Sequence, residues 1–309
     1  MTNLKQIVLA TSLIGVSLGG ASTFAADEPT TSHKEDIHVV PPSGHTLTAN
    51  VGLYSQYVFR GLAQTNEDPA LQGGFDYSHA SGIYLGVWGS NISWLKENAT
   101  TGSNATAGTY KTGGTLEMDF YGGYKGSVGD FSYDVGLLQY YYPGSVFTTS
   151  PSTPKANTLE AYGAVGWKWF TLKYSQSLTD TFGVKNAKGT YYLDLSGNFP
   201  IGETGLTFGA HYGMQKYKGT DDRNYGGASN DTLDSYDDYR ISLAYDLGKA
   251  GKTFENMTVG VIYTDTTSAN KCAYGSYSDT CRIKGVIYNG VFPKDISKSQ
   301  TTVYISKTF

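Results

Sequence analysis

The chain has 309 residues and a formal net charge of −4 at pH 7; only 16% of its residues are charged, yet it contains 39 glycines and 26 tyrosines. Mild acidity argues against nucleic acid as a partner, because proteins that bind it are usually basic. The low charge content is unusual for a soluble domain, in which about a quarter of the residues are charged. It suits a surface that faces lipid around a polar interior.

The N-terminal segment has the features of a secretory signal. Lys5 precedes an apolar run at 7–18, and small residues follow up to Ala26. A charged start, a short apolar run and an A-x-A cleavage site define a signal peptide. The run is too short for a membrane helix, which needs about 20 apolar residues. We therefore expect residues 1–25 to be a signal peptide and the chain to be exported.

Residues 26–46 are polar, contain three prolines and show no periodicity. These features predict a flexible periplasmic leader. His33, His38 and His45 also occur here, and a metal-binding tail is the alternative. Their spacing fits no standard ligand set, so we favour a leader without a metal.

Residues 47–309 show a strand pattern throughout. Apolar and polar residues alternate, as where Met118 and Phe120 are interleaved with Glu117, Asp119 and Tyr121. A period of two is the signature of a strand with one apolar face, and lengths near ten suit tilted strands that cross a membrane. The twelve expected strands cover 47–59, 70–80, 82–93, 115–125, 130–141, 158–168, 169–179, 189–199, 205–216, 237–247, 257–266 and 300–309.

The connections between these strands alternate between short and long, which is typical of outer-membrane barrels. The short ones lie near 79–82, 126–129, 168–169, 200–205 and 248–256, and the long ones at 60–69, 94–114, 142–157, 180–188, 217–236 and 267–299. An open sheet would leave unpaired backbone groups in hydrocarbon, so the sheet must close. We therefore predict an all-β fold: a transmembrane antiparallel up-and-down barrel of about twelve strands, with short periplasmic turns and longer extracellular loops.

The last strand supports a location in the outer membrane of a Gram-negative bacterium. It alternates over 301–309 and ends on Phe309, as closing strands read by the barrel-insertion machinery commonly do. Lys307 departs from that pattern, and an edge strand of a soluble sandwich is the alternative. Aromatic residues at the strand ends are expected to form interfacial girdles: Tyr57, Phe59, Tyr77, Trp94, Tyr140, Tyr141, Tyr142, Trp167 and Trp169.

The first two hairpins resemble a known family. The sequences YSQYVFRGLAQT at 54–65, PALQGGFDY at 69–77 and GIYLGVWGSN at 82–91 are similar to those of the TorF family of outer-membrane proteins, which are assigned as porins. Ala63 stands where that family is expected to have serine. The resemblance is specific over 50–93 and implies an outer-membrane barrel of the porin class, with no established substrate.

If the apolar side faces lipid, the charged residues line the interior, because a charge on the lipid face costs about 2–4 kcal/mol at mid-depth. The function we expect is passive diffusion of small polar solutes with a mild preference for cations, which acidic side chains select. The alternative role for these charges is pairing across strands to hold the wall together. The candidate pore-lining residues are Asp76, Glu117, Asp119, Lys125, Asp134, Glu160, Lys168, Lys173, Asp194, His211, Asp238 and Arg240.

Cys272 and Cys281 are the two cysteines, both in the last long loop. Export to an oxidising compartment predicts a disulfide between them, and a redox role is the alternative. No catalytic, metal or phosphate motif is present in the sequence, so we expect neither an enzyme nor a cofactor. A receptor or adhesin with a sealed lumen is the rival function. An insertion long enough to fold into the barrel as a plug would favour it, and no connection in the sequence is obviously of that kind. The solute and the oligomeric state are not specified by the sequence.

Overall fold

The computed structural model describes residues 44–97, 114–145, 155–220 and 227–309. The expected signal peptide and all but the end of the expected leader lie outside the described residues. Those two assignments therefore remain predictions, except that the last two residues of the expected leader, His45 and Thr46, belong to the first barrel strand.

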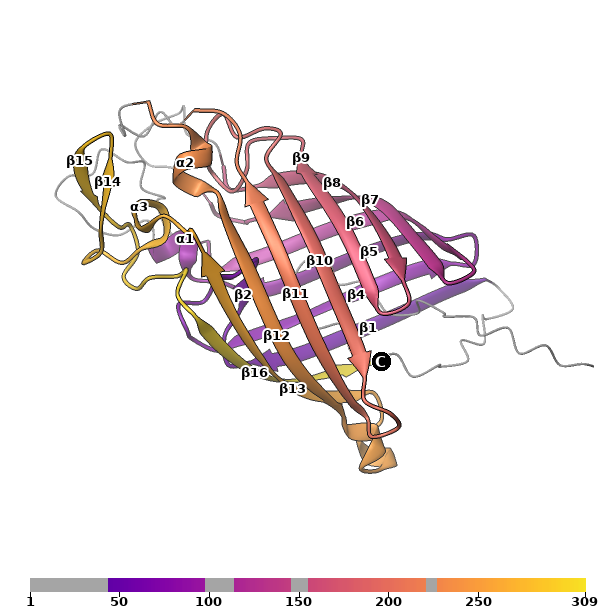
Figure 1. Cartoon of the computed structure of the whole chain (residues 1–309). Coiled ribbons are helices and arrows are strands. Elements are labelled where there is room, and N and C mark those ends of the chain that lie inside the picture. The colour runs from indigo at the N-terminus through magenta and orange to yellow at the C-terminus, as the bar shows by residue number, and fades with distance from the viewer. Residues whose placement is uncertain (1–43, 98–113, 146–154, 221–226) are drawn as a thin grey trace, which may run out of the picture.

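Twelve antiparallel strands close into a single barrel (Figure 1), as the alternation predicts. Each strand pairs with its neighbours in chain order, and β1 closes the ring by pairing with β16. The strands are β1 (His45–Tyr54), β4 (Ala70–His79), β5 (Ile83–Asn91), β6 (Leu116–Val128), β7 (Phe131–Tyr141), β8 (Thr158–Trp167), β9 (Phe170–Ser177), β10 (Tyr191–Pro200), β11 (Leu206–Lys216), β12 (Tyr236–Asp246), β13 (Met257–Thr267) and β16 (Gln300–Thr308).

The remaining elements lie in the connections. The long connections hold β2 (Val58–Phe59), β3 (Leu62–Ala63), α1 (Trp94–Glu97), α2 (Asn230–Asp234), α3 (Lys271–Tyr274), β14 (Thr280–Ile283) and β15 (Val286–Asn289). The turn between β12 and β13 holds two 3-10 helices, η1 (Leu247–Lys249) and η2 (Lys252–Phe254). Among the described residues, no helix is long and apolar enough to cross a membrane.

Side chains alternate between the outside and the inside of the barrel along every strand. On β1, Leu53 is 55% exposed whereas Tyr54 is 5% exposed. On β4, Leu71 is 60% exposed and Gln72 only 3%. The exposed face is apolar and the inward face is polar or aromatic, which is the pattern of a barrel surrounded by lipid.

Inward tyrosines lie across inward glycines of adjacent strands, which explains why both residue types are abundant. A Cβ atom added to Gly86 would lie 2.3 Å from the ring of Tyr121. Because Gly86 has no side chain, the ring of Tyr121 can cross β5. The Tyr121 hydroxyl then donates a hydrogen bond to Asp76 on β4 at 2.5 Å. Gly123 likewise lies beneath the hydroxyl of Tyr84, 2.6 Å from its added Cβ. Each such pair ties neighbouring strands together from the inside.

The expected aromatic girdle divides into two groups. Trp167, Trp169 and Tyr141 are exposed on the outside. Tyr57, Phe59, Tyr140 and Tyr142 are instead buried within the barrel, so their assignment to the interface was wrong. Their position near the strand ends in sequence does not determine the face on which they lie. Tyr77 and Trp94 are partly buried.

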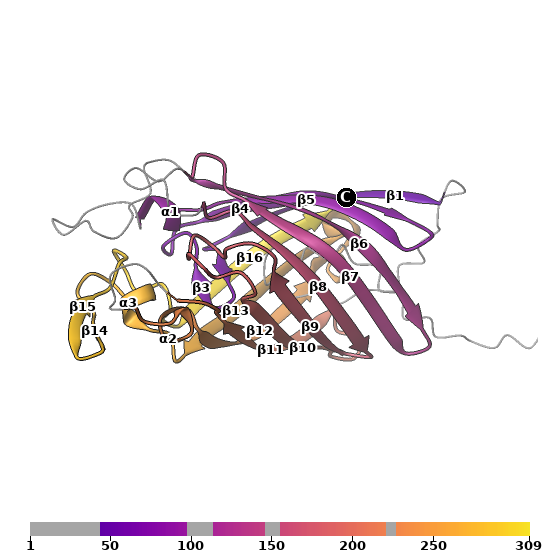
Figure 2. The same ribbon diagram turned by 90° about the horizontal axis from the view of Figure 1, so that it is seen from above.

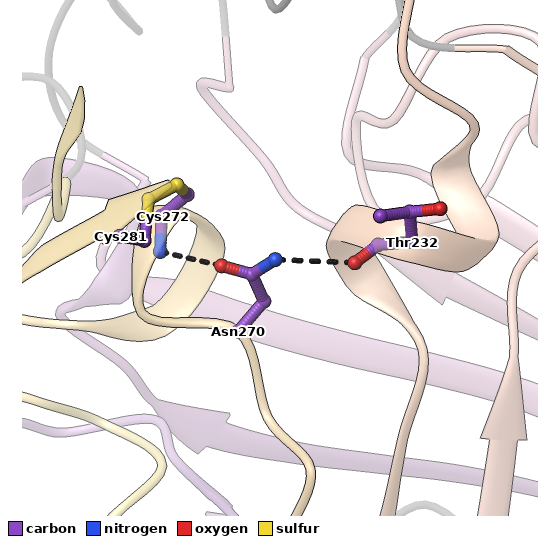
Figure 3. Close-up of a disulfide and its surroundings, with 4 residues drawn as sticks. All are labelled: Thr232, Asn270, Cys272 and Cys281. Carbon is purple, nitrogen blue, oxygen red and sulfur yellow. Dashed lines mark hydrogen bonds between the residues drawn. A yellow bond between two sulfur atoms is a disulfide. The ribbon is translucent and has the colours of Figure 1, made fainter. Parts of the chain in front are cut away.

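The last long connection, residues 268–299, folds into a cap at the long-loop end of the barrel (Figure 1). It contains a disulfide between Cys272 and Cys281, as the sequence predicts. The side chain of Asn270 accepts a hydrogen bond from the Cys272 N–H at 2.9 Å and donates to the Thr232 carbonyl at 3.1 Å (Figure 3). The disulfide-closed segment is thereby attached to the connection that carries α2.

Candidate functional site

The connection between β1 and β4 turns into the barrel instead of extending away from it. The strand expected at 47–59 ends at Tyr54, and β2 and β3 form a short hairpin within residues 55–69, called the inward hairpin below (Figure 2). Arg60 and Gly61 form its two-residue turn, with φ values of 45° and 80°. Two positive φ values are those of a type I′ turn. Arginine in this conformation is uncommon, and it places Arg60 at the tip.

Arg60 crosses the interior and binds the opposite wall. Its two terminal nitrogens contact the carboxylate of Glu160 on β8 at 3.0 and 2.8 Å. It also donates to Gln215 on β11 at 3.0 Å, and its guanidinium lies 4.3 Å from the ring centre of Tyr192 on β10. Arg60 is 4% exposed and Glu160 is 2% exposed. The pair therefore has the forked geometry of a strong, buried arginine–carboxylate interaction.

The tip of the inward hairpin also packs closely against β12 and β13. A Cβ atom on Gly61 would lie 2.6 Å from the Cβ of Asp238 on β12 and 2.7 Å from a methyl of Thr266 on β13. No side chain fits there, so glycine is required by close approach as well as by its positive φ.

The cap holds the base of the inward hairpin. The Ala63 N–H donates to the Ile296 carbonyl at 2.9 Å. Lys298 and Lys294 bind the Glu67 carboxylate at 2.5 and 3.2 Å. The hydrogen bond from Lys298, with that from Lys294, holds the pKa of Glu67 below its usual range. The two long connections therefore form one assembly at the long-loop end.

Two carboxylates on β6 lie buried beside this hairpin. Glu117 is 1% exposed and accepts a hydrogen bond from the Tyr57 hydroxyl at 3.0 Å. Asp119, two residues further along the same face, is 0% exposed. It lies between Trp88 on β5 and Tyr140 on β7, which are its partners in the strand register.

A second polar cluster joins β10, β11 and β12. The two ring nitrogens of His211 lie 2.9 Å from Asp194 and 2.9 Å from Asp238. A carboxylate at each nitrogen suits an imidazolium that donates from both sides. The hydroxyl of Ser196 donates to Asp194 at 2.6 Å. The same hydroxyl lies 3.2 Å from Nδ1 of His211, so the serine, the imidazole and the two carboxylates form one connected polar cluster.

The half of the interior near the short turns has a different lining. Its inward side chains are small and polar, and they are partly exposed, whereas those around the inward hairpin are buried. The partly exposed residues include Thr46, Thr48, Asn50, Ser78, Ser132, Thr171, Ser196, Asn198 and Ser306. The inward charged residues lie on the same faces of the strands, among these polar residues and between them and the long-loop end.

The candidate residues from the sequence fall on the inward face, with one exception. Asp76, Glu117, Asp119, Lys125, Asp134, Glu160, Lys173, Asp194, His211, Asp238 and Arg240 occupy inward positions of their strands. Lys168 lies instead in the exposed turn between β8 and β9, with its amine 5.0 Å from the ring centre of Trp167. Whether any of them lines a pore remains a prediction.

Sequence reasoning missed Arg60 as a site residue. Its one available signal was the Arg60–Gly61 pair, a turn-forming dipeptide within alternating residues. The described residues hold no group of three or more histidine, cysteine, aspartate or glutamate side chains arranged to bind a metal ion.

The fold and the site define a transmembrane β-barrel whose first long connection folds inside and binds the opposite wall. The chain belongs to the Gcw_chp family, described as bacterial proteins of unknown function, whose model matches residues 38–309. No curated protein sequence matches the chain significantly.

Several solved outer-membrane structures are similar in overall fold. OmpF of Salmonella typhi, in complex with daunomycin, is 11% identical with a TM-score of 0.38, over 86% of this chain and 97% of that one. An anion-selective porin from Comamonas acidovorans is 13% identical with a TM-score of 0.33, over 86% and 99%. OprD from Pseudomonas aeruginosa is 12% identical with a TM-score of 0.34, over 85% of this chain and 64% of that one. These scores describe a general resemblance among barrels and carry no functional detail.

Proposed function

We propose that the protein is an outer-membrane channel of a Gram-negative bacterium, used for passive diffusion of small polar solutes. The observation that carries this proposal is the partly exposed polar lining of the half near the short turns. A barrel that served only as a scaffold would fill this space with its own side chains, as eight-stranded barrels do. Twelve strands enclose more space, and here the inward residues leave it accessible.

The proposed path has to pass the inward hairpin. This hairpin lies at the long-loop end, where Arg60 reaches Glu160 and the surrounding side chains are buried. Solutes would pass beside this hairpin, so its contacts set the size limit. Inward carboxylates outnumber inward cationic side chains, and acidic linings favour cations. We therefore propose a mild cation preference.

Several finer assignments belong to the same proposal. The resemblance of residues 50–93 to the TorF family supports a porin role. The strand that ends at Phe309 is proposed to be recognised by the barrel-insertion machinery. Its backbone already pairs with β1, since the Phe309 N–H donates to the Ala49 carbonyl at 2.8 Å. Outer-membrane lipids and small polar solutes are the proposed partners; the oligomeric state is left open.

Single-channel recording tests the function directly. Refolded protein is inserted into a planar bilayer under a KCl gradient, and heat-modifiable electrophoretic mobility verifies that the barrel is folded. We expect stable ohmic steps with a reversal potential on the cation side. Reversal on the anion side would refute the charge preference and keep the channel. A folded barrel that never conducts would refute the channel.

A receptor or adhesin acting through the long loops is the second candidate. One observation favours it: an inserted segment does enter the barrel, and the cap packs against it. In that case the hairpin seals the lumen and the cap presents the binding surface. A silent bilayer with a folded barrel is the result expected of this function.

A further inference from the structure

Asp119 is a buried inward carboxylate for which the barrel wall supplies no hydrogen-bond donor among the described residues. Both of its oxygen atoms are buried, and neither has a hydrogen-bond partner among the described residues. Its side chain points inward from β6 between two aromatic residues. Buried carboxylates are normally paired or hydrogen-bonded, so this side chain calls for a ligand.

The neighbouring charges balance Asp119 only in part, because Arg60 attracts it whereas Glu117 and Glu160 repel it. Glu117 is two residues away on the same face and accepts hydrogen bonds from two tyrosine hydroxyls, those of Tyr57 and Tyr142. Arg60, the nearby cation, is engaged in a forked pair with Glu160. Among the described residues of this region, the carboxylates of Glu117, Asp119 and Glu160 outnumber the cations of Arg60 and Lys173, which interacts with both Arg60 and Glu160. Burying unbalanced charge is costly, and a bound cation would remove the cost.

The surroundings also indicate which kind of cation fits. Trp88 is the register partner of Asp119 and is 1% exposed, and the ring of Tyr57 packs on it at 5.6 Å between ring centres. Aromatic faces attract cations that give up their water readily. The site is lined by aromatic rings and has almost no exposed surface, so it suits an ion that gives up its water more readily than Mg²⁺, which keeps several waters when bound.

We propose that Asp119 and Glu117 bind a weakly hydrated monovalent cation, of the potassium or ammonium type, beside the inward hairpin. This inference rests on the proposed channel function, for which it identifies the site that selects the ion. Asp119 supplies the free carboxylate, and Glu117 supplies a second charge oriented by Tyr57. The ion reaches the site from the polar half of the barrel.

Thallium(I), a heavy monovalent ion close to potassium in size, tests the site because it quenches tryptophan fluorescence on contact. Refolded full-length protein is titrated with thallium(I) nitrate at constant ionic strength set by lithium nitrate. We expect a saturable quenching component that disappears in Trp88→Phe. We expect Asp119→Asn to weaken it about tenfold or more, equivalent to ~1.4 kcal/mol or more. Asp130→Asn, at an exposed position in the short turn between β6 and β7, is the control and should leave the midpoint unchanged.

Quenching that does not saturate, or that is the same in Asp119→Asn, would overturn the site. A proton held by Asp119 in place of a cation gives that result. If Asp119→Asn does not fold, competition in the wild-type protein decides: potassium must displace thallium, and lithium must not. Binding at equilibrium needs no conduction. If the protein binds thallium but does not conduct in the bilayer, the cation site stands and the channel function is refuted. If it conducts but does not bind thallium, the channel function stands and the cation site is refuted.

Discussion

Replacing Arg60 by alanine removes the contact that fixes the inward hairpin to the opposite wall. The guanidinium and the Glu160 carboxylate are almost fully buried, with side-chain exposures of 5% and 3%. Alanine leaves the carboxylate without its partner in a desolvated setting. Removing one member of a buried ion pair costs about 3–5 kcal/mol. The loss of the stacking contact with Tyr192 adds to this cost.

The hairpin offers one way to limit that cost. If it moves away, water can reach Glu160 and the penalty falls. Arg60→Ala should therefore lower the free energy of unfolding by up to about 3–5 kcal/mol, raise the single-channel conductance, or do both. Urea unfolding in detergent micelles measures the first, and planar-bilayer recording measures the second. Arg282→Ala, at an exposed position in the cap, is the control and should change neither.

A double-mutant cycle separates the pair from its surroundings. Glu160→Gln in the Arg60→Ala background removes the unpaired charge, so it should restore part of the stability. The reasoning is refuted if Arg60→Ala costs less than about 1 kcal/mol, the value of an exposed ion pair, and leaves the conductance unchanged. In that case the arginine does not hold the hairpin in place.

Three further changes test other parts of the structure. Gly86→Ala places a methyl group 2.3 Å from the tyrosine ring that crosses it and should cost about 1–3 kcal/mol in urea unfolding, whereas Gly163→Ala, whose nearest neighbour is 3.9 Å away, should cost far less. Glu67 has a lowered pKa because two lysines bind it, so its stabilisation is present above its unfolded pKa near 4.5 and is lost as the pH falls through its folded pKa. Glu67→Gln should remove this acid sensitivity of the cap. The measurement is the rate of proteolytic cleavage in the cap, recorded in steps of about one pH unit from about pH 3 to 7. Reducing Cys272–Cys281 should destabilise the cap by roughly 2–3 kcal/mol and leave barrel unfolding unchanged; an equal effect on the barrel would show that the two are coupled.

The alternation of side chains was sufficient to predict the wall of the barrel. Every expected strand overlaps a strand of the structure, and the last one, 300–309, differs from β16 by a single residue. The reason is physical. Each wall strand meets lipid on one side and the polar interior on the other, so the face of each residue is recorded in a period of two. The charged residues that this alternation assigns to the interior lie at inward strand positions, except for Lys168, which lies in a turn.

The first strand shows where this local signal ends. The alternation that predicts the first strand runs from Leu47 to Phe59, yet the wall strand stops at Tyr54 because the residues beyond it pair with each other in the inward hairpin. A strand inside the barrel has the same period as one in its wall. The pattern alone therefore does not distinguish them, and Tyr57 and Phe59 were assigned to the wrong environment.

The sequence by itself determined the class of fold, the number of strands and the alternating faces, because these follow from residue spacing and from the need to pair every backbone group in lipid. Only the tertiary structure decided what occupies the lumen. Arg60 and Glu160 are 100 residues apart, and they meet because closure of the ring brings opposite walls within reach of one hairpin. The same closure buries Asp119 beside that hairpin. Contacts across a closed barrel depend on its diameter and register, which the spacing of residues within one strand does not record.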